Sequence, residues 1–311
     1  MKPTLLILSD FSDQHLEQIR QAYNVLYAPR PAQRSAEIAS NGAQVQAVLT
    51  IGSVGLKAEE MALMPNLTLI CALGAGYEEI DTGAARARNI VVSNGAGTND
   101  ACVADHAMGL LLSAVRGIPQ LGVALHQGIW RTALPLPANV SFKRLGILGL
   151  GTIGQQIAKR ALGFDMEIGY HSRSARQDCP FTYFDSLLGL AQWADFLVVA
   201  TPGGPGTRHI VNAAVLDALG PTGVLVNIAR GSVVDTEALS QALRRQGIAA
   251  AGLDVYESEP APPQQLMHLP NVVLTPHVAG WSPESVDATV DLFLENAERH
   301  FAGLAVLTPV V

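Results

Sequence analysis

A glycine-rich turn stands almost halfway along the 311-residue chain, directly after the apolar run Leu145–Leu148. It reads Gly149-Leu150-Gly151-Thr152-Ile153-Gly154. A G-x-G-x-x-G turn between a strand and a helix is typical of sites for a dinucleotide pyrophosphate. Its glycines allow a tight turn, close approach of the backbone to the phosphates, and close packing of helix on strand. We therefore expect a dinucleotide-binding domain here, and the mid-chain position indicates that another domain precedes it.

The residues before this turn alternate short apolar runs with helical patterns. The runs predict strands over Thr4–Ser9, Ala47–Thr50, Thr68–Ala72 and Ile90–Ser93. Helices are predicted over Asp13–Ala22, Leu56–Met64 and Asp81–Arg88, followed by a longer apolar helix over Asp100–Arg116. Such alternation of strand and helix predicts a parallel sheet with helices on both faces.

The alternation restarts at the glycine turn. It predicts a helix over Thr152–Gly163 and further strands over Met166–Tyr170, Asp195–Ala200, Gly223–Ile228, Ala249–Leu253 and Asn271–Thr275, about six strands in all. A last helix, Pro283–Gly303, is expected to return to the first domain. The predicted fold is therefore α/β, with two doubly wound parallel-sheet domains: a substrate domain of residues 1–99 plus 282–311, and a dinucleotide-binding domain of residues 100–281.

Composition argues against several classes of partner. Charged residues make up 15% of the chain and the net charge is -7 without a basic stripe, so we expect no nucleic-acid binding. No apolar stretch approaches the roughly 20 residues that span a bilayer, and the N-terminus lacks a signal-peptide pattern. Cys71, Cys102 and Cys179 have neither metal nor disulfide spacing. These features predict a cytoplasmic protein with reduced thiols and no metal site.

Three reactive side chains follow three predicted strands of the second domain. Arg230 comes shortly after the first, Glu259 after the second and His277 after the third. Since ligands bind beyond the carboxyl ends of parallel strands, these groups should converge beside the dinucleotide. Together they favour reduction of a 2-oxo acid: Arg230 would bind the carboxylate and polarise the carbonyl, His277 would donate a proton, and Glu259 would keep the imidazole protonated. A nicotinamide would supply the hydride.

Motifs along nearly the whole chain resemble the D-isomer-specific 2-hydroxyacid dehydrogenases, and most closely their glyoxylate/hydroxypyruvate reductase branch. The motifs are Gly74-Ala75-Gly76-Tyr77, Val103-Ala104-Asp105-His106, Trp130-Arg131, Asn227-Ile228-Ala229-Arg230-Gly231, Gly252 to Pro260, and Pro276-His277-Val278-Ala279-Gly280-Trp281. The chain departs from the family where Asp105 replaces a glutamate and where Gly95 stands in place of a proline.

The resemblance implies a Rossmann domain inserted into a flavodoxin-like domain and a homodimer formed through the nucleotide-binding domains. It implies that Arg230, Glu259 and His277 are the catalytic residues and that the backbone of Ala75 and Gly76 binds the substrate carboxylate. Leu73 and Trp281 complete the expected substrate site, although Trp281 could equally cover the seam between domains. The expected cofactor residues are Gly149, Gly151, Thr152, Ile153, Gly154, Ser172, Arg173, Ser174, Thr201, Pro202, Ile228, Ala229, Asp254 and Ala279.

The segment after the predicted strand Met166–Tyr170 bears on the choice of cofactor. An NAD site normally has Asp or Glu about 20 residues beyond the glycines, where it bonds the ribose 2′-hydroxyl. This chain has Ser172-Arg173-Ser174 instead, with Arg176 close by. Hydroxyls and a cation suit a 2′-phosphate, so we predict NADPH in preference to NADH, with NADH still possible.

Several readings stay open at this point. Small 2-oxo acids such as glyoxylate and hydroxypyruvate are the leading substrates, and 2-ketogluconate is the nearest alternative. Formate oxidation is disfavoured because that branch carries Gln where Glu259 stands, and phosphoglycerate oxidation because the chain stops at Val311 without a regulatory extension. A dinucleotide-sensing binding protein is the alternative from another class. Among neighbouring residues, His106 is expected to pack and Glu257 to be solvated.

Overall fold

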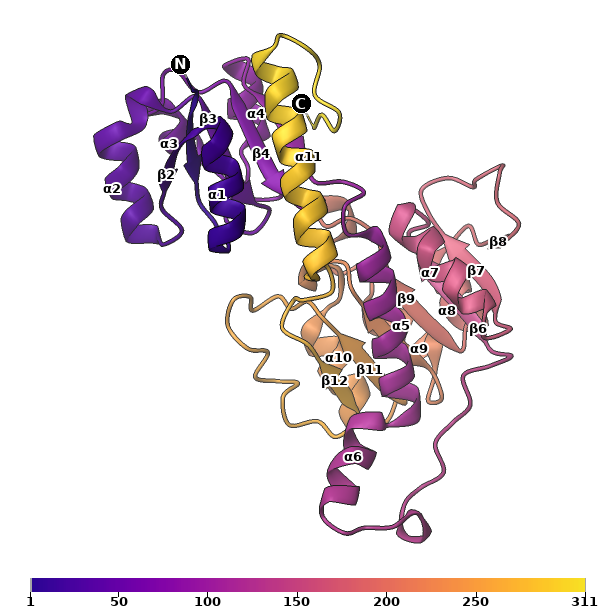
Figure 1. The fold of residues 1–311 in the computed structure, drawn as a ribbon. Helices are drawn as coiled ribbons and strands as arrows, with labels where there is room; N and C mark the ends of the chain where they lie inside the picture. The colour runs from indigo at the N-terminus through magenta and orange to yellow at the C-terminus, as the bar shows by residue number, and fades with distance from the viewer. Residues whose placement is uncertain (1, 311) are drawn as a thin grey trace. The chain divides into compact units, whose positions relative to one another are not determined.

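The computed structural model describes residues 2–310. The chain divides into two compact units, one made of Met1–Asn99 with Gly280–Val311 and the other of Asp100–Ala279. Each unit holds one sheet in which all paired strands are parallel (Figure 1). The predicted α/β class with two doubly wound parallel sheets is confirmed.

The first unit contains a five-stranded sheet in the order β2-β1-β3-β4-β5. This is the order of flavodoxin-like folds. Its strands are β1 (Thr4–Ile7), β2 (Asn24–Tyr27), β3 (Ala47–Ile51), β4 (Leu69–Leu73) and β5 (Val91–Asn94). Its helices are α1 (Asp13–Ala22), α2 (Pro31–Asn41), α3 (Ala58–Ala62), α4 (Thr82–Ala87) and α11 (Pro283–Phe301).

Alternation along β1 sends successive side chains into two separate cores. Leu5 and Ile7 pack with α1 and α11, whereas Leu6 packs with α2, α3 and α4. The side chains of Leu5, Leu6 and Ile7 are all fully buried. Burial on both faces explains why the strand reads as a continuous apolar run rather than an alternating one.

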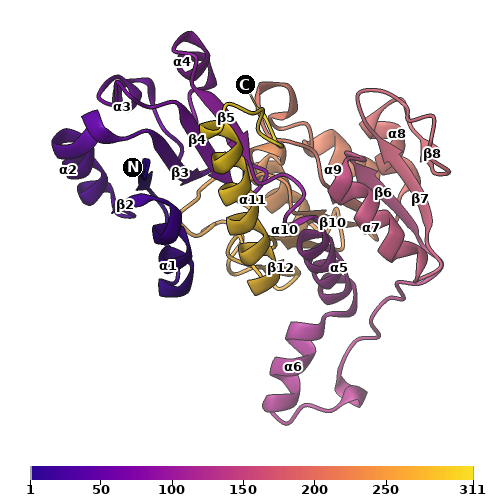
Figure 2. The ribbon, with the colours of Figure 1, turned by 45° about the horizontal axis from the view of Figure 1, so that its top comes forward.

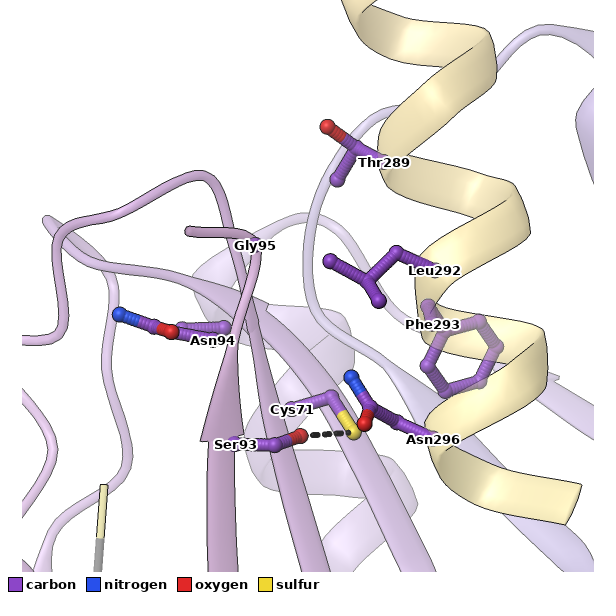
Figure 3. Close-up of a pocket in the computed structure, with 9 residues that line it drawn as sticks. Cys71, Ser93, Asn94, Gly95, Thr289, Leu292, Phe293 and Asn296 are labelled. Atoms are coloured by element: carbon purple, nitrogen blue, oxygen red, sulfur yellow. Dashed lines mark hydrogen bonds between the residues drawn. The ribbon is translucent and has the colours of Figure 1, made fainter. Parts of the chain in front are cut away.

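A small pocket lies where α11 crosses β4 and β5, and both polar and apolar side chains line it (Figure 3). The Cys71 thiol and the Ser93 hydroxyl are hydrogen-bonded there at 3.0 Å. Burial raises the pKa of Cys71 to about 12, which the bond to Ser93 only partly offsets. Because thiolate is the reactive form, Cys71 is an inert structural thiol. It is unpaired, as are Cys102 and Cys179.

The second unit contains a seven-stranded sheet in the order β12-β11-β10-β9-β6-β7-β8. Its strands are β6 (Arg144–Leu148), β7 (Glu167–His171), β8 (Thr182–Tyr183), β9 (Phe196–Val199), β10 (Val224–Asn227), β11 (Ala250–Leu253) and β12 (Val272–Leu274). Its helices are α5 (Asp100–Arg116), α6 (Ile118–His126), α7 (Thr152–Leu162), α8 (Leu187–Trp193), α9 (Ala213–Leu219) and α10 (Thr236–Arg244). The strand order reverses between β6 and β9, which is the point where doubly wound sheets bind their ligands.

Two cores also cover this second sheet. Helices α5 and α7 pack on one face with residues such as Ile147, and α8, α9 and α10 pack on the other with residues such as Leu197. The chain between α5 and β6 extends away from the rest of the unit and carries α6 (Figure 1, Figure 2). Among the described residues no single helix is long and apolar enough to cross a membrane; α5 and α6 together pass by length and composition but are bent by 57°.

Several short elements were not expected from the sequence, namely β2, β8, α2, α6, α8, α9 and α10. The second sheet therefore has seven strands where about six were predicted. The additional strand, β8, is a two-residue strand at the sheet edge. Strand β8 is too short to show an alternating apolar pattern, and it forms because it pairs with β7.

Candidate active site

The glycine turn after β6 has the close approaches that a dinucleotide site requires. The φ of Gly149 is +95°, and a Cβ on it would lie 2.8 Å from the carbonyl oxygen of Ala200. A Cβ on Gly154 would lie 2.2 Å from the carbonyl oxygen of Gly149. Gly151, by contrast, has no atom within 4 Å of its Cβ position. The first and third glycines are thus packed against protein, while the second faces open space where a pyrophosphate can approach.

Helix α7 begins directly at this open position. Its N-cap is Gly151, which provides no side chain to bond the first N–H groups of the helix. Thr152 and Ile153 form the first turn, and their N–H donors are available to an anion. These residues therefore fit a dinucleotide by their own geometry.

The end of β7 is tied to the same turn. The Leu150 N–H donates to the Ser172 hydroxyl at 3.1 Å. Arg173 and Ser174 follow and are exposed. Arg176 is paired with Asp178 at 3.1 Å, so its charge is partly compensated. Arg173 directly follows Ser172, the residue that bonds the glycine turn.

The segment after β10 is held by a buried amide. The side chain of Asn227 accepts from the Ala229 N–H at 3.0 Å and donates to the Arg230 carbonyl at 3.1 Å. The guanidinium of Arg230 donates to the Ala229 carbonyl at 2.6 Å. On the neighbouring segment after β9, beyond Thr201 and Pro202, a Cβ on Gly203 would lie 2.8 Å from Cγ of Arg230. Asn227 and Gly203 therefore fix where the arginine stem runs.

The segments after β10 and β11 approach each other at Gly231. A Cβ there would lie 1.9 Å from the carbonyl carbon of Tyr256 and 2.3 Å from the Glu257 nitrogen. Since real Cβ atoms do not come so near to backbone atoms, any side chain at position 231 would push the two segments apart. The glycine after Arg230 is therefore required by packing.

His277 and Glu259 form a hydrogen-bonded pair. Nδ1 of His277 lies 2.7 Å from Oε2 of Glu259, and the other carboxylate oxygen accepts from the Tyr256 N–H at 2.7 Å. The bond to Glu259 raises the pKa of His277 above its ordinary 6.5, against an opposing effect of burial. Burial opposes ionisation of Glu259, yet its bonds to His277 and Tyr256 outweigh this and lower its pKa, with help from Arg230.

Asp254 holds the backbone that carries His277. Its Oδ1 accepts from the Thr275 hydroxyl at 2.6 Å and the Val278 N–H at 2.9 Å, and its Oδ2 from the Ala279 N–H at 2.8 Å. His277 itself has a φ of +55°, which a residue other than glycine seldom adopts. Asp254 therefore stabilises the turn that presents the imidazole.

His106 belongs to the same network. Its Nε2 lies 2.9 Å from the Thr275 hydroxyl and 3.5 Å from Oδ1 of Asp254. Burial acts against ionisation of Asp254, but its bonds to His106, Thr275 and the backbone lower its pKa. Within the described residues, no group of three or more His, Cys, Asp or Glu side chains could hold a metal ion.

The remaining predicted substrate residues belong to the first unit. Leu73 ends β4, and the segment from Gly74 follows with a φ of +74° at that glycine. The Ala75 carbonyl accepts from the Asn94 side chain at 2.8 Å. A Cβ on Gly95 would lie 2.6 Å from the Gly74 nitrogen, which explains glycine at this position. Gly76 lies against Gly52, and Trp281, directly before α11, is 75% exposed.

Comparison with known proteins identifies the family. Residues 108–279 match the model of the D-isomer specific 2-hydroxyacid dehydrogenase NAD binding domain. Glyoxylate/hydroxypyruvate reductase A of Arabidopsis thaliana is 37% identical over 99% of this chain and 98% of its own length. The chain belongs to the D-isomer-specific 2-hydroxyacid dehydrogenases. The predicted family and the predicted enzyme class, an oxidoreductase acting on CH–OH groups, are confirmed.

Two further relatives of this dehydrogenase bear on its chemistry. A 2-ketogluconate reductase of Gluconobacter oxydans is 38% identical over 86% of both chains. The crystal structure of an NADPH-dependent glyoxylate/hydroxypyruvate reductase from Sinorhizobium meliloti, in complex with NADP and malonate, is 38% identical. It superposes with a TM-score of 0.92 and covers 100% of this dehydrogenase and 97% of its own chain. Relatives of the dehydrogenase therefore act on 2-oxo acids.

The supporting roles around Arg230 were not predicted from the sequence. Asn227 and Gly231 belong to a motif that carries the family resemblance, but neither they nor Gly203 were expected to hold this segment in place. Nor was the contact between His209 and Glu257 expected, in which Nε2 of the imidazole lies 2.6 Å from Oε1 of the carboxylate. This pair is 48 residues apart in sequence, so no local pattern could reveal it.

Proposed function

We propose that this dehydrogenase reduces small 2-oxo acids, such as glyoxylate and hydroxypyruvate, to D-2-hydroxy acids with NADPH as preferred cofactor. The observation that carries the proposal is the 2.7 Å bond between His277 and Glu259, at the same sheet edge as Arg230. An imidazole with a raised pKa beside a guanidinium supplies the two groups that carbonyl reduction needs, a proton donor and an anion-binding cation.

His277, Glu259 and Arg230 then have distinct roles. The bound nicotinamide would supply the hydride. Because Nδ1 of His277 is bonded to Glu259, Nε2 is the nitrogen that gives its proton to the substrate oxygen. Glu259 keeps the ring charged near neutral pH, and Arg230 binds the carboxylate and polarises the carbonyl. In the direction of oxidation His277 takes the proton back, so it must then be neutral.

Residues of the first unit would complete the substrate site. The backbone N–H groups of Ala75 and Gly76 suit a carboxylate, since the bonds around Gly74 and Gly95 give this segment a defined shape. Leu73 and Trp281 would set the size of substrate that fits. A larger sugar acid such as 2-ketogluconate is the second candidate, favoured by the Gluconobacter relative that is named for it.

The preference for NADPH rests on the end of β7. Ser172, Arg173 and Ser174 offer hydroxyls and a cation there and no carboxylate. The NADPH-dependent relative from Sinorhizobium meliloti supports this assignment. Replacing the exposed Arg173 by Ala is expected to raise KM for NADPH about tenfold, the size of one exposed ionic contact, and to leave KM for NADH unchanged. Equal loss with both cofactors would contradict a 2′-phosphate contact.

The other expected cofactor residues surround the glycine turn and the site. Thr201 and Pro202 would line the adenosine side, and Ile228 and Ala229 follow β10. Asp254 and Ala279 would lie on the nicotinamide side, although both carboxylate oxygens of Asp254 already accept bonds from the turn that carries His277. We therefore assign Asp254 a supporting role at that turn.

A homodimer formed through the second unit is the proposed assembly. Large apolar side chains of α6 and the following segment are exposed, among them Trp130 at 64%, Leu136 at 98% and Phe142 at 77%. Exposed apolar groups gathered on one segment mark interaction surfaces. Replacing Leu136 and Trp130 together by Asp should convert a dimer into a monomer in light scattering, whereas an unchanged mass would place the interface elsewhere. A cytoplasmic location stays a prediction.

A panel of 2-oxo acids measured with both cofactors tests the function. Turnover of glyoxylate or hydroxypyruvate with NADPH, at a kcat/KM at least about tenfold above that with NADH, is the expected result. Faster turnover of 2-ketogluconate would favour the second candidate. Binding of NADPH without turnover of any 2-oxo acid would contradict the proposal and favour a dinucleotide-sensing protein.

A further inference from the structure

The segment 254–260 after β11 carries a second glutamate whose bonds lead away from His277. Oε1 of Glu257 lies 2.6 Å from Nε2 of His209. Its Oε2 accepts from both the N–H of Thr236, at 3.1 Å, and the hydroxyl of Thr236, at 2.6 Å. The side chain is 25% exposed, so the expectation of a solvated bystander does not describe it. We call Glu257, His209 and Thr236 the Glu257 clamp.

The Glu257 clamp joins the segments that follow three neighbouring strands. His209 lies after β9, Thr236 after β10 and Glu257 after β11. His209 is fixed at its backbone too, because its N–H donates to the Ser232 carbonyl at 2.8 Å. Its φ is +50°, a conformation that a residue other than glycine adopts at a cost, so the surrounding bonds hold it there.

Each of these three segments touches the catalytic groups. The segment after β9 includes Gly203, which lies against the stem of Arg230. That after β10 carries Arg230 itself. The segment after β11 carries Glu259, two residues beyond Glu257, and contacts Gly231 with its backbone. A bond that ties the three together therefore sets the spacing between Arg230 and Glu259.

We propose that the Glu257 clamp is a positioning site for the reaction, which holds Glu259 against His277 and fixes Arg230 beside them. The proposal rests on the proposed reduction of 2-oxo acids by His277. Glu257 acts through other residues and has no contact with the reacting atoms. The ionisable groups that face it are His209 and Arg208, the latter at 3.8 Å.

A carboxylate is the side chain that this clamp needs. Both oxygens of Glu257 act as acceptors, and Oε2 accepts twice from Thr236. Gln would keep one acceptor oxygen and turn an amide N–H₂ towards other donors. Burial opposes ionisation of Glu257, yet bonds to His209 and Thr236 lower its pKa, so it is ionised at neutral pH. Glu257→Gln should therefore weaken the clamp and Glu257→Ala should abolish it.

The test compares Glu257→Ala with Thr236→Val, which removes the hydroxyl bond without changing charge, and with Thr236→Ser, which keeps it. In Glu257→Ala, kcat/KM for glyoxylate reduction should fall about 10- to 100-fold, as small displacements of catalytic groups do. The basic limb of the pH profile should move down towards pH 6.5, because Glu259 holds His277 less well. Thr236→Val should show a smaller change of the same kind, and Thr236→Ser close to none.

Matched controls separate positioning from folding and from charge. Glu237→Ala removes a carboxylate from the first turn of α10 that bonds Gln241, and it should leave the pH limb in place. The Kd for NADPH should stay within about twofold in all variants, since the glycine turn lies after another strand. A pH limb that stays at its wild-type position in Glu257→Ala, or an equal loss of NADPH binding, would overturn the proposal.

A titration of the His277 ring by NMR distinguishes this proposal from the function on which it rests. If the wild-type enzyme reduced no 2-oxo acid, the proposed function would fail, yet the pKa of His277 should still fall in Glu257→Ala if the clamp positions Glu259. If the wild-type enzyme is active and the ring titrates identically in Glu257→Ala, the clamp proposal is wrong and the function stands.

Discussion

Two glutamates of the segment 254–260 each pair with a histidine, and the two pairs differ in the donor that the second carboxylate oxygen accepts from. In the His277–Glu259 pair, that oxygen accepts from Tyr256 in the same segment. In the His209–Glu257 pair, it accepts from Thr236 on another segment. Both pairs join different segments: the first links those after β11 and β12, and the second links those after β9 and β11 and also reaches the one after β10 through Thr236. We propose that the first pair exchanges a proton with substrate, whereas the second holds three segments together. On this proposal, the same two residue types serve chemistry in one place and positioning in the other.

Breaking each pair at its histidine should give the largest contrast. His277→Ala should lower kcat for 2-oxo acid reduction about 10²- to 10⁴-fold, the contribution of a general acid, with NADPH affinity nearly unchanged. His209→Ala should cost about tenfold or less in kcat/KM, because it removes one bond of the Glu257 clamp. Steady-state kinetics with NADPH titration measure both.

His268→Ala is the matched control, since His268 is exposed on the segment between β11 and β12. It should retain wild-type kinetics. Equal losses in the His277 and His209 variants would mean that the two pairs do not differ as described.

Gly231 packs against the backbone of Tyr256 and Glu257, in the segment that holds both glutamates, so a substitution there should disturb both pairs. Gly231→Ala places a Cβ 1.9 Å from the carbonyl carbon of Tyr256, so the segment with both glutamates must move. We expect a loss of about 1–3 kcal/mol in the free energy of unfolding and a fall in kcat/KM. Gly206→Ala, at a position with no atom within 4 Å, should be neutral in denaturant unfolding and in kinetics. Wild-type activity in Gly231→Ala would show that this contact is dispensable.

The pairs should also differ, more subtly, in how stability depends on pH. Glu257 has a lowered pKa in the fold, so its contribution is present above its unfolded value of 4.5 and is lost as pH falls through the folded value. His277 has a raised pKa, so its contribution is complete below 6.5 and is lost as pH rises through the folded value. As pH falls from about 7 to well below 4.5, where the wild-type carboxylate becomes protonated, Glu257→Gln should lose less Tm than wild type. An identical loss would mean that Glu257 forms no stabilising bond.

The parts of the fold that could be predicted are those with local signals. The glycine turn is encoded in six consecutive residues, and strand ends place Arg230, Glu259 and His277 because parallel strands bring their carboxyl ends to one edge. Helix α5 shows its apolar pattern over 17 residues. Short helices such as α9, of seven residues, do not, and they form because they pack on the sheet.

The supporting residues of the site could not be predicted for a different reason. Glu257 and His209 are ordinary polar residues in sequence, and their bond exists because β9 and β11 flank β10 in the sheet. The place of Asp254 on the nicotinamide side stays a prediction, and the sequence did not reveal that its carboxylate anchors the turn of His277. Which polar group meets which is decided by strand order, and that order emerges only in the folded chain.

The most direct test is the pH dependence of kcat/KM in wild type and in Glu259→Gln, measured for reduction and for oxidation. In wild type, kcat/KM for reduction should fall and kcat/KM for oxidation should rise as pH increases. Both changes should share one apparent pKa above 6.5, since the two directions use opposite protonation states of His277. In Glu259→Gln, which has no carboxylate to hold the imidazolium, both limbs should move to lower pH. Limbs that stay at the same pH in the two enzymes would contradict the central claim that Glu259 keeps His277 charged for proton transfer.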